Sequence, residues 1–179
     1  MKNMHKIGRL LAVCLIAVLA VVALGGCGQS EKFAGHWIGY GKTGIYGNKD
    51  MAYDITIEKN GKGYIINETN NYWDDLDTTN TFFKNSPKKV QMKWVTQKNE
   101  NLVGTVKDNN LAINGSNWFF TYKENDGTLQ LTLESFNMGR ETIQLHKAKD
   151  GELDEFKNKG KEELLNKYKS QDYNIELQE

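Results

Sequence analysis

The stretch Met51–Gly63, MAYDITIEKNGKG, alternates apolar and polar side chains and then ends in a glycine-rich turn. The apolar residues that fall on one side of an extended chain here are Met51, Tyr53, Ile55 and Ile57. A period of two predicts a β-strand that buries one of its faces. Asn60-Gly61 supplies the positive φ angles of a tight hairpin turn. We therefore expect the chain to return antiparallel through Gly63–Trp73.

The same alternation recurs on both sides of this hairpin, from about residue 33 to residue 147. The other expected strands lie near Phe33–Trp37, Val90–Val95, Leu102–Val106, Leu111–Ile113, Trp118–Tyr122, Leu129–Leu133 and Ile143–Leu145. Open sheet edges promote aggregation, so a run of short hairpins must stack as two sheets or close on itself. We predict an all-β domain over residues 33–148, an antiparallel meander of about eight or nine strands that closes into a barrel.

After residue 148 the spacing of apolar residues becomes helical. The apolar residues at this spacing are Leu153, Phe156, Leu164, Leu165 and Tyr168. They predict an amphipathic α-helix over residues 149–169, with a break at Gly160 as an open alternative, that packs against the barrel. Residues 170–179 are expected to form a flexible tail.

The first part of the chain has the layout of an export signal. Lys2, Lys6 and Arg9 form a basic opening, and the apolar run Leu10–Leu24 follows it. This run is shorter than the roughly 20 residues that a membrane-spanning helix needs, and small residues come after it, as at a signal cleavage site. The alternative is an uncleaved N-terminal membrane anchor in a locally thinned bilayer.

Leu24-Gly25-Gly26-Cys27 resembles the lipobox of bacterial lipoproteins, in which an aliphatic residue and two small residues precede a cysteine. The resemblance implies that residues 1–26 are a signal peptide, that Cys27 is acylated on its sulfur, and that residues 27–32 form a lipidated tether. Two or more acyl chains anchor a protein stably. We therefore expect a protein anchored by lipid at the cell membrane, with its domain on the extracytoplasmic side.

Composition and cysteine content exclude several function classes. The chain has 23 basic and 23 acidic residues, and loss of Lys2, Lys6 and Arg9 leaves a small acidic excess, so nucleic acid is not an expected partner. The two cysteines are Cys14 and Cys27, which leaves no disulfide and no cysteine-based zinc site for the mature domain. The chain also lacks the common hydrolase and metalloprotease motifs. We predict no catalytic residue, metal or cofactor, and do not expect an enzyme.

Two further patterns resemble known sites but are better explained by structure. Gly39–Gly44 spells G-x-G-x-x-G, yet a dinucleotide site needs a helix directly after it, and another strand is expected here. Asp75 and Asp77 alternate as calcium ligands do, but the glycine and glutamate of an EF-hand loop are missing. We expect a rim loop in the first case and a solvated acidic loop, Trp73–Thr78, in the second.

Phe33-Ala34-Gly35-His36-Trp37 resembles the G-x-W signature of the calycins, the superfamily of lipocalin and fatty-acid-binding barrels. In that superfamily an arginine near the last strand packs over the first-strand tryptophan and closes one end of the barrel. The resemblance assigns this closure to Gly35, Trp37 and Arg140, as a structural contact worth about 0.5–2 kcal/mol. In the alternative, Trp37 is a core residue of another kind of β-sandwich.

The barrel interior is the expected place for a ligand, because an eight-stranded barrel has room for side chains or for one small molecule. If Tyr64 and Ile66 point inward, alternation turns Glu68, Asn70 and Tyr72 inward as well. Polar groups would then lie inside one end of an apolar barrel, as they do in ligand pockets. The alternative is that the segment from Glu68 to Tyr72 extends past the barrel into solvent.

The sequence therefore predicts a cell-envelope lipoprotein whose lipocalin-like barrel binds a small, partly apolar ligand, with membrane contact through the lipid on Cys27. The ligand-binding candidates are Trp37, Glu68, Asn70, Tyr72, Trp94, Trp118, Phe120 and Tyr122. The alternative is a non-enzymatic protein-interaction module, a filled barrel that docks an envelope partner through an aromatic rim or the C-terminal helix.

Overall fold

The computed structural model describes residues 31–43, 49–83, 85–135 and 139–178. The chain divides into two compact units, Met1–Lys32 and Phe33–Glu179, and the folded domain is the second. Cys27 and the expected signal peptide lie outside the described residues, so the lipobox stays a prediction from sequence. Among the described residues, no helix is long and apolar enough to cross a membrane.

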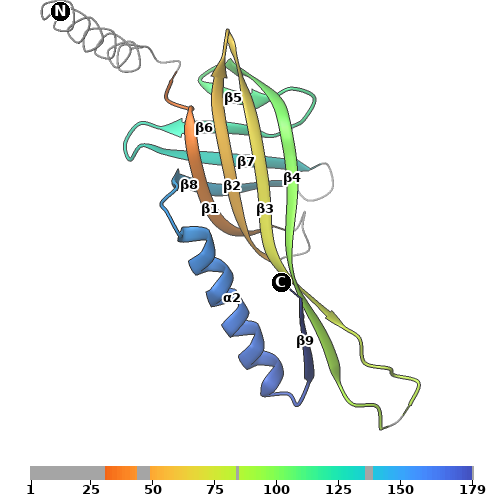
Figure 1. Cartoon of the computed structure of the whole chain (residues 1–179). Coiled ribbons are helices and arrows are strands. Elements are labelled where there is room, and N and C mark those ends of the chain that lie inside the picture. The colour runs from red at the N-terminus through yellow and green to blue at the C-terminus, as the bar shows by residue number, and fades with distance from the viewer. Residues whose placement is uncertain (1–30, 44–48, 84, 136–138, 179) are drawn as a thin grey trace, which may run out of the picture. The chain divides into compact units, whose positions relative to one another are not determined.

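Eight antiparallel strands form a closed barrel (Figure 1). They are β1 (Gly35–Thr43), β2 (Lys49–Asn60), β3 (Gly63–Asp77), β4 (Lys89–Lys107), β5 (Asn110–Ile113), β6 (Phe119–Lys123), β7 (Thr128–Ser135) and β8 (Gly139–Lys147). Each strand pairs with the next one in sequence, and β8 pairs back with β1. The predicted all-β meander and its closure are confirmed.

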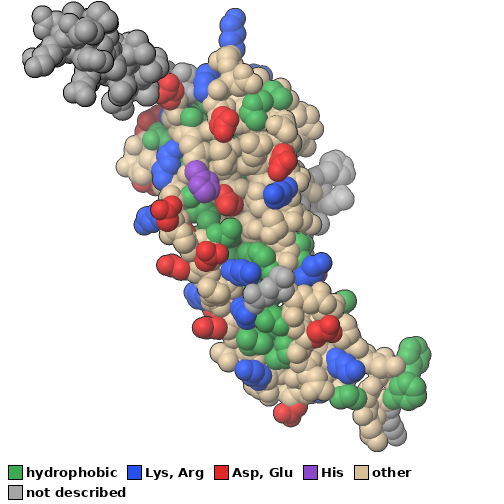
Figure 2. Space-filling view, in the orientation of Figure 1, with side chains coloured by type: hydrophobic (Ala, Val, Ile, Leu, Met, Phe, Trp, Pro, Cys, Tyr) green, Lys and Arg blue, Asp and Glu red, His purple; other side chains and the backbone are tan. Residues whose placement is uncertain are grey.

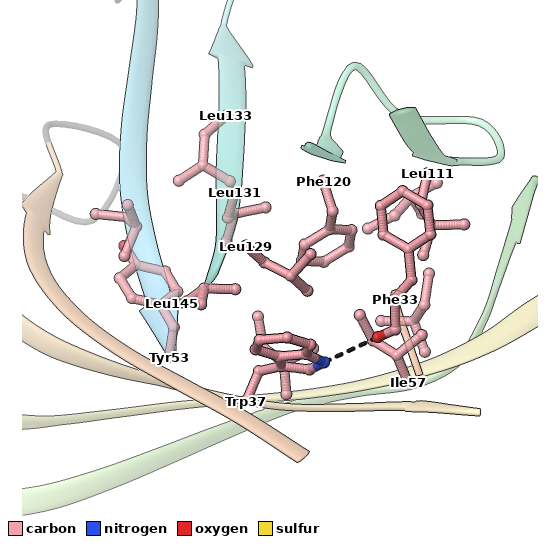
Figure 3. Close-up of a cluster of buried hydrophobic side chains, with 14 of the residues drawn as sticks. Phe33, Trp37, Tyr53, Ile57, Leu111, Phe120, Leu129, Leu131, Leu133 and Leu145 are labelled. Atoms are coloured by element: carbon pink, nitrogen blue, oxygen red, sulfur yellow. Dashed lines mark hydrogen bonds between the residues drawn. The ribbon is translucent and has the colours of Figure 1, made fainter. Parts of the chain in front are cut away.

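Apolar side chains pack together in the barrel interior (Figure 3), and partly buried Leu102 of β4 packs against them. The buried residues of this core are Phe33, Trp37, Met51, Tyr53, Ile55, Ile57, Tyr64, Ile66, Leu111, Ile113, Phe120, Leu129, Leu131, Leu133, Ile143 and Leu145. Trp37 lies among them with no exposed surface, and its indole nitrogen donates a 2.8 Å hydrogen bond to the carbonyl oxygen of Phe33. This bond satisfies the one polar atom of the indole, as burial of a tryptophan requires.

Trp37 is covered by a lysine. The ammonium group of Lys147 lies 3.7 Å from the centroid of the Trp37 ring and donates a 2.8 Å hydrogen bond to the carbonyl oxygen of Ala34. Gly35 makes room for it, because the φ angle of Gly35 is +131° and a Cβ atom there would collide with the Lys147 ammonium. Gly35 and Trp37 thus form one packed contact with Lys147 at this end of the barrel.

The expectation that Arg140 packs over Trp37 is wrong. The β1–β8 register pairs Trp37 with Lys147, whereas Arg140 lies near the other end of β8. There Arg140 forms an ion pair with Glu134 and lies 5.7 Å from the centroid of the Phe119 ring. The strand register, which sequence alternation does not specify, decides which cation reaches the tryptophan.

β3 and β4 continue past the barrel as a long hairpin, and two C-terminal elements flank this extension (Figure 1). Helix α2 (Glu152–Lys169) lies on its outer face, and strand β9 (Asn174–Gln178) pairs in parallel with β4. A second hydrophobic cluster lies between them, formed by Trp73, Val90, Met92 and Tyr168, with Trp94, Leu164, Leu165, Tyr173 and Ile175 packed against it. The amphipathic C-terminal helix is thus confirmed.

Four local expectations differ from the structure. Residues 170–179 were expected to form a flexible tail, but residues 174–178 form β9. The acidic segment expected as a loop lies mostly within β3, and the segments expected as separate strands near Val90 and Leu102 are one strand, β4. A bulge in β4, opposite Ile66 and Glu68, separates its two halves. Helix α2 begins at Glu152 and runs through Gly160 without a break.

Candidate functional site between the C-terminal helix and the barrel

Helix α2 is held to the barrel at its N-terminal end by aromatic and polar contacts. The ring of Phe156 stacks on Tyr40 of β1, with centroids 4.9 Å apart. A ring nitrogen of His146 on β8 lies 2.6 Å from the carboxylate of Glu152. Burial, together with the negative charge of Glu152, raises the pKa of the Tyr40 hydroxyl. These contacts fix the start of the helix even though Gly151, its N-cap residue, provides no side-chain cap.

The C-terminal end of α2 is held by the acidic end of β3. The hydroxyl of Tyr168, a buried residue, donates a hydrogen bond to the carboxylate of Asp75, and Lys167 forms a 3.2 Å ion pair with the same group. The hydroxyl of Tyr173 donates a 2.9 Å hydrogen bond to Asp77. Asp75 and Asp77 therefore serve as acceptors for the C-terminal segment. No group of acidic, histidine or cysteine side chains in the described ranges is arranged to hold a metal ion.

Gly160 lets the middle of the helix approach β3 closely. A Cβ atom at Gly160 would lie 3.0 Å from Cδ1 of Trp73, which is tighter than ordinary packing allows. The indole nitrogen of Trp73 also donates a 2.8 Å hydrogen bond to the carbonyl oxygen of Lys157. Gly160, considered in the sequence as a possible helix break, therefore serves to pack the helix against Trp73.

A groove of about 610 Å³ opens between α2 and the outer surface of β1, β2 and β3. Its lining residues are Lys42, Lys49, Asp50, Trp73, Asp75, Phe156, Lys159, Gly160, Glu163, Leu164 and Lys167. Its apolar part consists of Trp73, Phe156 and Leu164. Figure 2 shows hydrophobic side chains in the strip where α2 meets the strands, with charged side chains around them. The volume and the mixed lining are typical of small-molecule sites.

Four lysines border the groove, and each has an acidic neighbour. Lys42 lies 3.2 Å from Asp50, Lys159 lies 4.0 Å from Glu163, and Lys49 contacts Asp74. Lys167 is the fourth, paired with Asp75 as described above. Exposed ion pairs of this kind contribute little to stability, so these ammonium groups can turn from their partners to an anionic ligand at small cost.

The structure separates the predicted ligand-binding residues into two places. Trp37 and Phe120 are wholly buried in the barrel core, and Tyr72, Trp118 and Tyr122 are partly buried against it. Trp94 is elsewhere, because it faces outward from β4. Its ring lies 5.4 Å from Trp73 and 6.3 Å from Phe156, centroid to centroid. The prediction of one aromatic wall inside the barrel is therefore wrong for Trp94.

Glu68 and Asn70 do face the barrel interior, as alternation predicted. Glu68 is 3 % exposed and Asn70 has no exposed surface. The side-chain amide of Asn99 donates a 3.0 Å hydrogen bond to Oε2 of Glu68, while Oε1 of Glu68 accepts no hydrogen bond from the described residues. Burial raises the pKa of the Glu68 carboxyl, although hydrogen bonds from Asn99 and Asn70 oppose the rise.

The two cavities described for this part of the chain lie outside the barrel. Besides the groove, a second hollow of about 490 Å³ lies on the outer surface of β6, β7 and β8. It is lined by Lys123, Asn125, Asp126, Gln130, Thr142 and Gln144, all polar. The groove combines apolar walls with charged groups and this hollow does not, so the groove is the better candidate of the two for a partly apolar ligand.

The sequence did not predict the groove, because its lining residues come from β1, β2, β3 and α2, which are far apart in the chain. One sequence feature could have indicated it. Side chains alternate along β3 up to the end of the barrel, and Trp73 is an odd number of residues from the inward-facing Glu68 and Asn70. Its large aromatic ring therefore had to face outward. Comparison with known proteins finds no family model, no curated protein and no solved structure that matches this chain.

Proposed function

We propose that the protein is a cell-envelope lipoprotein, anchored through Cys27, whose barrel domain binds a small, partly apolar ligand in the groove beside α2. The groove, with its aromatic wall and its lysine border, carries the proposal. The apolar part of a single-chain amphiphile would lie against Trp73, Phe156 and Leu164. An anionic head group would meet the ammonium groups of Lys42 and Lys159.

The groove is tested with three probes of equal chain length: laurate, dodecanol and dodecyltrimethylammonium. Tryptophan fluorescence is the readout, because Trp73 lines the groove and Trp94 lies beside it. We expect laurate to bind more tightly than dodecanol, and dodecanol more tightly than the cationic probe. Saturating laurate that changes neither the fluorescence nor the melting temperature would contradict the proposal.

Two substitutions locate the site. Phe156→Ala removes part of the apolar wall and should weaken laurate binding by roughly tenfold or more, since burial of such a side chain is worth about 1.5–3 kcal/mol. Lys159→Gln changes an exposed side chain of the border and should weaken laurate but not dodecanol. Lys62→Gln, in the distant β2–β3 turn, is the matched control. Loss of binding in Glu68→Gln alone would instead place the ligand inside the barrel.

The expected anchor is tested separately. In cells fed radiolabelled palmitate, Cys27→Ser should abolish incorporation of the label and move the protein out of the membrane pellet, because the thiol is the acylated group. A variant that keeps both the label and its place in the pellet would rule out the lipoprotein assignment while leaving groove binding intact.

The second candidate, a protein-interaction module, is favoured by the packed interior of the barrel and by exposed aromatic residues. Phe82 is 96 % exposed and Phe83 is 68 % exposed. Cross-linking in cells that recovers an envelope protein from the wild type, but not from a variant at these positions, would support this function over ligand binding.

A further inference from the structure

Two adjacent phenylalanines project from the end of the β3–β4 hairpin. Phe82 and Phe83 are the most exposed large hydrophobic residues among those the structure describes, at 96 % and 68 %. In Figure 2 hydrophobic side chains stand out at this tip, away from the rest of the domain. Exposed apolar residues that are adjacent, rather than scattered, mark interaction surfaces.

Local hydrogen bonds hold the two rings outward. The amide of Phe82 donates a 3.1 Å hydrogen bond to the side chain of Asn80, and the amide of Ser86 donates a 3.0 Å bond to the carbonyl oxygen of Phe83. At the base of the tip, the amide of Thr78 donates a 2.9 Å bond to the carbonyl oxygen of Lys89. The turn is thus shaped so that both phenyl groups face solvent.

The charged residues within the tip are basic, although Asp77 lies at its base and interacts with the charge of Lys88. No acidic residue occurs in the sequence between Asp77 and Val90, whereas Lys88 and Lys89 lie at the base of the tip. Lys88 donates to the carbonyl oxygen of Gln171, and Lys89 is exposed. Apolar rings combined with nearby basic side chains suit the interface of an anionic bilayer, where the rings enter the acyl boundary and the cations meet phosphate groups.

We propose that the Phe82–Phe83 tip inserts into an anionic lipid surface. A bilayer suits this tip better than a protein partner, because a projecting pair of rings needs a matching pocket in a protein but only displaces head groups in a membrane. This inference is independent of ligand binding in the groove, since the tip shares no residue with the groove lining.

The test uses the chain from Gly28 to Glu179, which lacks the acylated cysteine and retains both hydrophobic clusters of the compact unit. Flotation is measured with vesicles of phosphatidylglycerol mixed with phosphatidylcholine, and with vesicles of phosphatidylcholine alone. We expect binding to the anionic vesicles, weakening with added salt, and little binding to the neutral ones. Absence of flotation with the anionic vesicles would overturn the proposal.

The double substitution Phe82→Ser and Phe83→Ser should reduce binding to anionic vesicles at least tenfold without changing the melting temperature or laurate binding. The matched control is Val103→Ser with Val106→Ser, which removes two half-exposed apolar side chains elsewhere on β4. Lys89→Gln should lower binding less and reduce its salt dependence. Equal flotation of the double serine variant and the wild type would contradict the proposal. So would a protein partner whose cross-linking requires Phe82 and Phe83, if the wild type does not bind the vesicles.

Discussion

Lys147 packs on Trp37 at one end of the barrel and donates a hydrogen bond to the carbonyl oxygen of Ala34, just before the first strand. The contact combines a cation–π interaction with a hydrogen bond, while partial burial lowers the pKa of the ammonium group. The sequence indicated that Trp37 is packed in this way, since the G-x-W pattern is local. The resemblance assigned the cation to Arg140, which is wrong, because the strand register brings Lys147 to the ring instead.

Lys147→Met should lower the free energy of unfolding by about 1–2 kcal/mol, because the cation–π contact and the bond to Ala34 are lost while the aliphatic stem remains. Arg140→Met should have a smaller effect, since its ion pair with Glu134 is exposed. Urea denaturation of both variants measures the difference. Equal effects, or a larger effect at Arg140, would show that the lysine does not close the barrel.

At the scale of elements, α2 and β9 depend on each other for their place on the β3–β4 hairpin. Tyr168 of α2 and Tyr173, just before β9, have ring centroids 5.1 Å apart, and their hydroxyls bond to Asp75 and Asp77. The helix was predictable from its spacing. Strand β9 was not, because its alternation of Ile175 and Leu177 is too short to distinguish a strand from a tail.

A chain that ends after Ser170 should keep its barrel but loosen α2. Removal of β9 exposes part of the surface of Val90 and Met92, which are buried in the full chain. We expect faster amide hydrogen exchange throughout α2, with unchanged protection in β6, β7 and β8. Glu176→Ala in the full chain, which keeps the β4–β9 ladder, is the control. Uniform loss of protection across the barrel would show that the two parts fold as one unit.

For the whole molecule, the closed meander was predictable from the alternation between residues 33 and 147, and from the short turns that make neighbouring strands antiparallel. The interior was harder to predict. Alternation placed Glu68 and Asn70 inside, but side-chain volumes and register decide whether an interior is filled or hollow. The apolar face of the helix was visible in the sequence, whereas the groove beside it arises from tertiary contacts of α2 at its two ends and at Trp73.

Glu68 should make the stability of the whole domain depend on pH. Burial raises its pKa above the usual value of 4.5, so the folded state holds this proton more tightly than the unfolded state does. The contribution of Glu68 to stability is therefore fully present below pH 4.5 and falls as pH rises from 4.5 through the raised pKa. Each unit of pKa difference between the two states costs about 1.4 kcal/mol.

Glu68→Gln should remove this decline, since glutamine does not ionise. Glu58→Gln, at an exposed position of β2, should leave the decline as it is in the wild type. Urea denaturation at a series of pH values from acid to neutral measures both slopes. A wild-type curve whose slope is unchanged by Glu68→Gln would mean that Glu68 is not the group responsible.

The proposed anchor and the Phe82–Phe83 tip also constrain orientation. In the sheet register Gly35 pairs with Ile57, and Ile57 pairs with Ile66. From Ile66 to Asp77, β3 is about 36 Å long at about 3.3 Å per residue. A tether over residues 27–32 spans at most about 20 Å. If both proposals hold, the two contacts reach one bilayer only when the hairpin lies close to its surface, so the tip would set the tilt of the protein and the lipid would attach it.

The position of α2 and β9 after every other described element has a consequence for biogenesis. Synthesis from the N-terminus delivers the barrel strands first, and the outer side of the β3–β4 extension has no cover until the helix and β9 have followed. During that interval Val90 and Met92 are open to contacts with other chains. We therefore expect a mutation in β9 to do the most harm while the new chain folds, rather than at equilibrium.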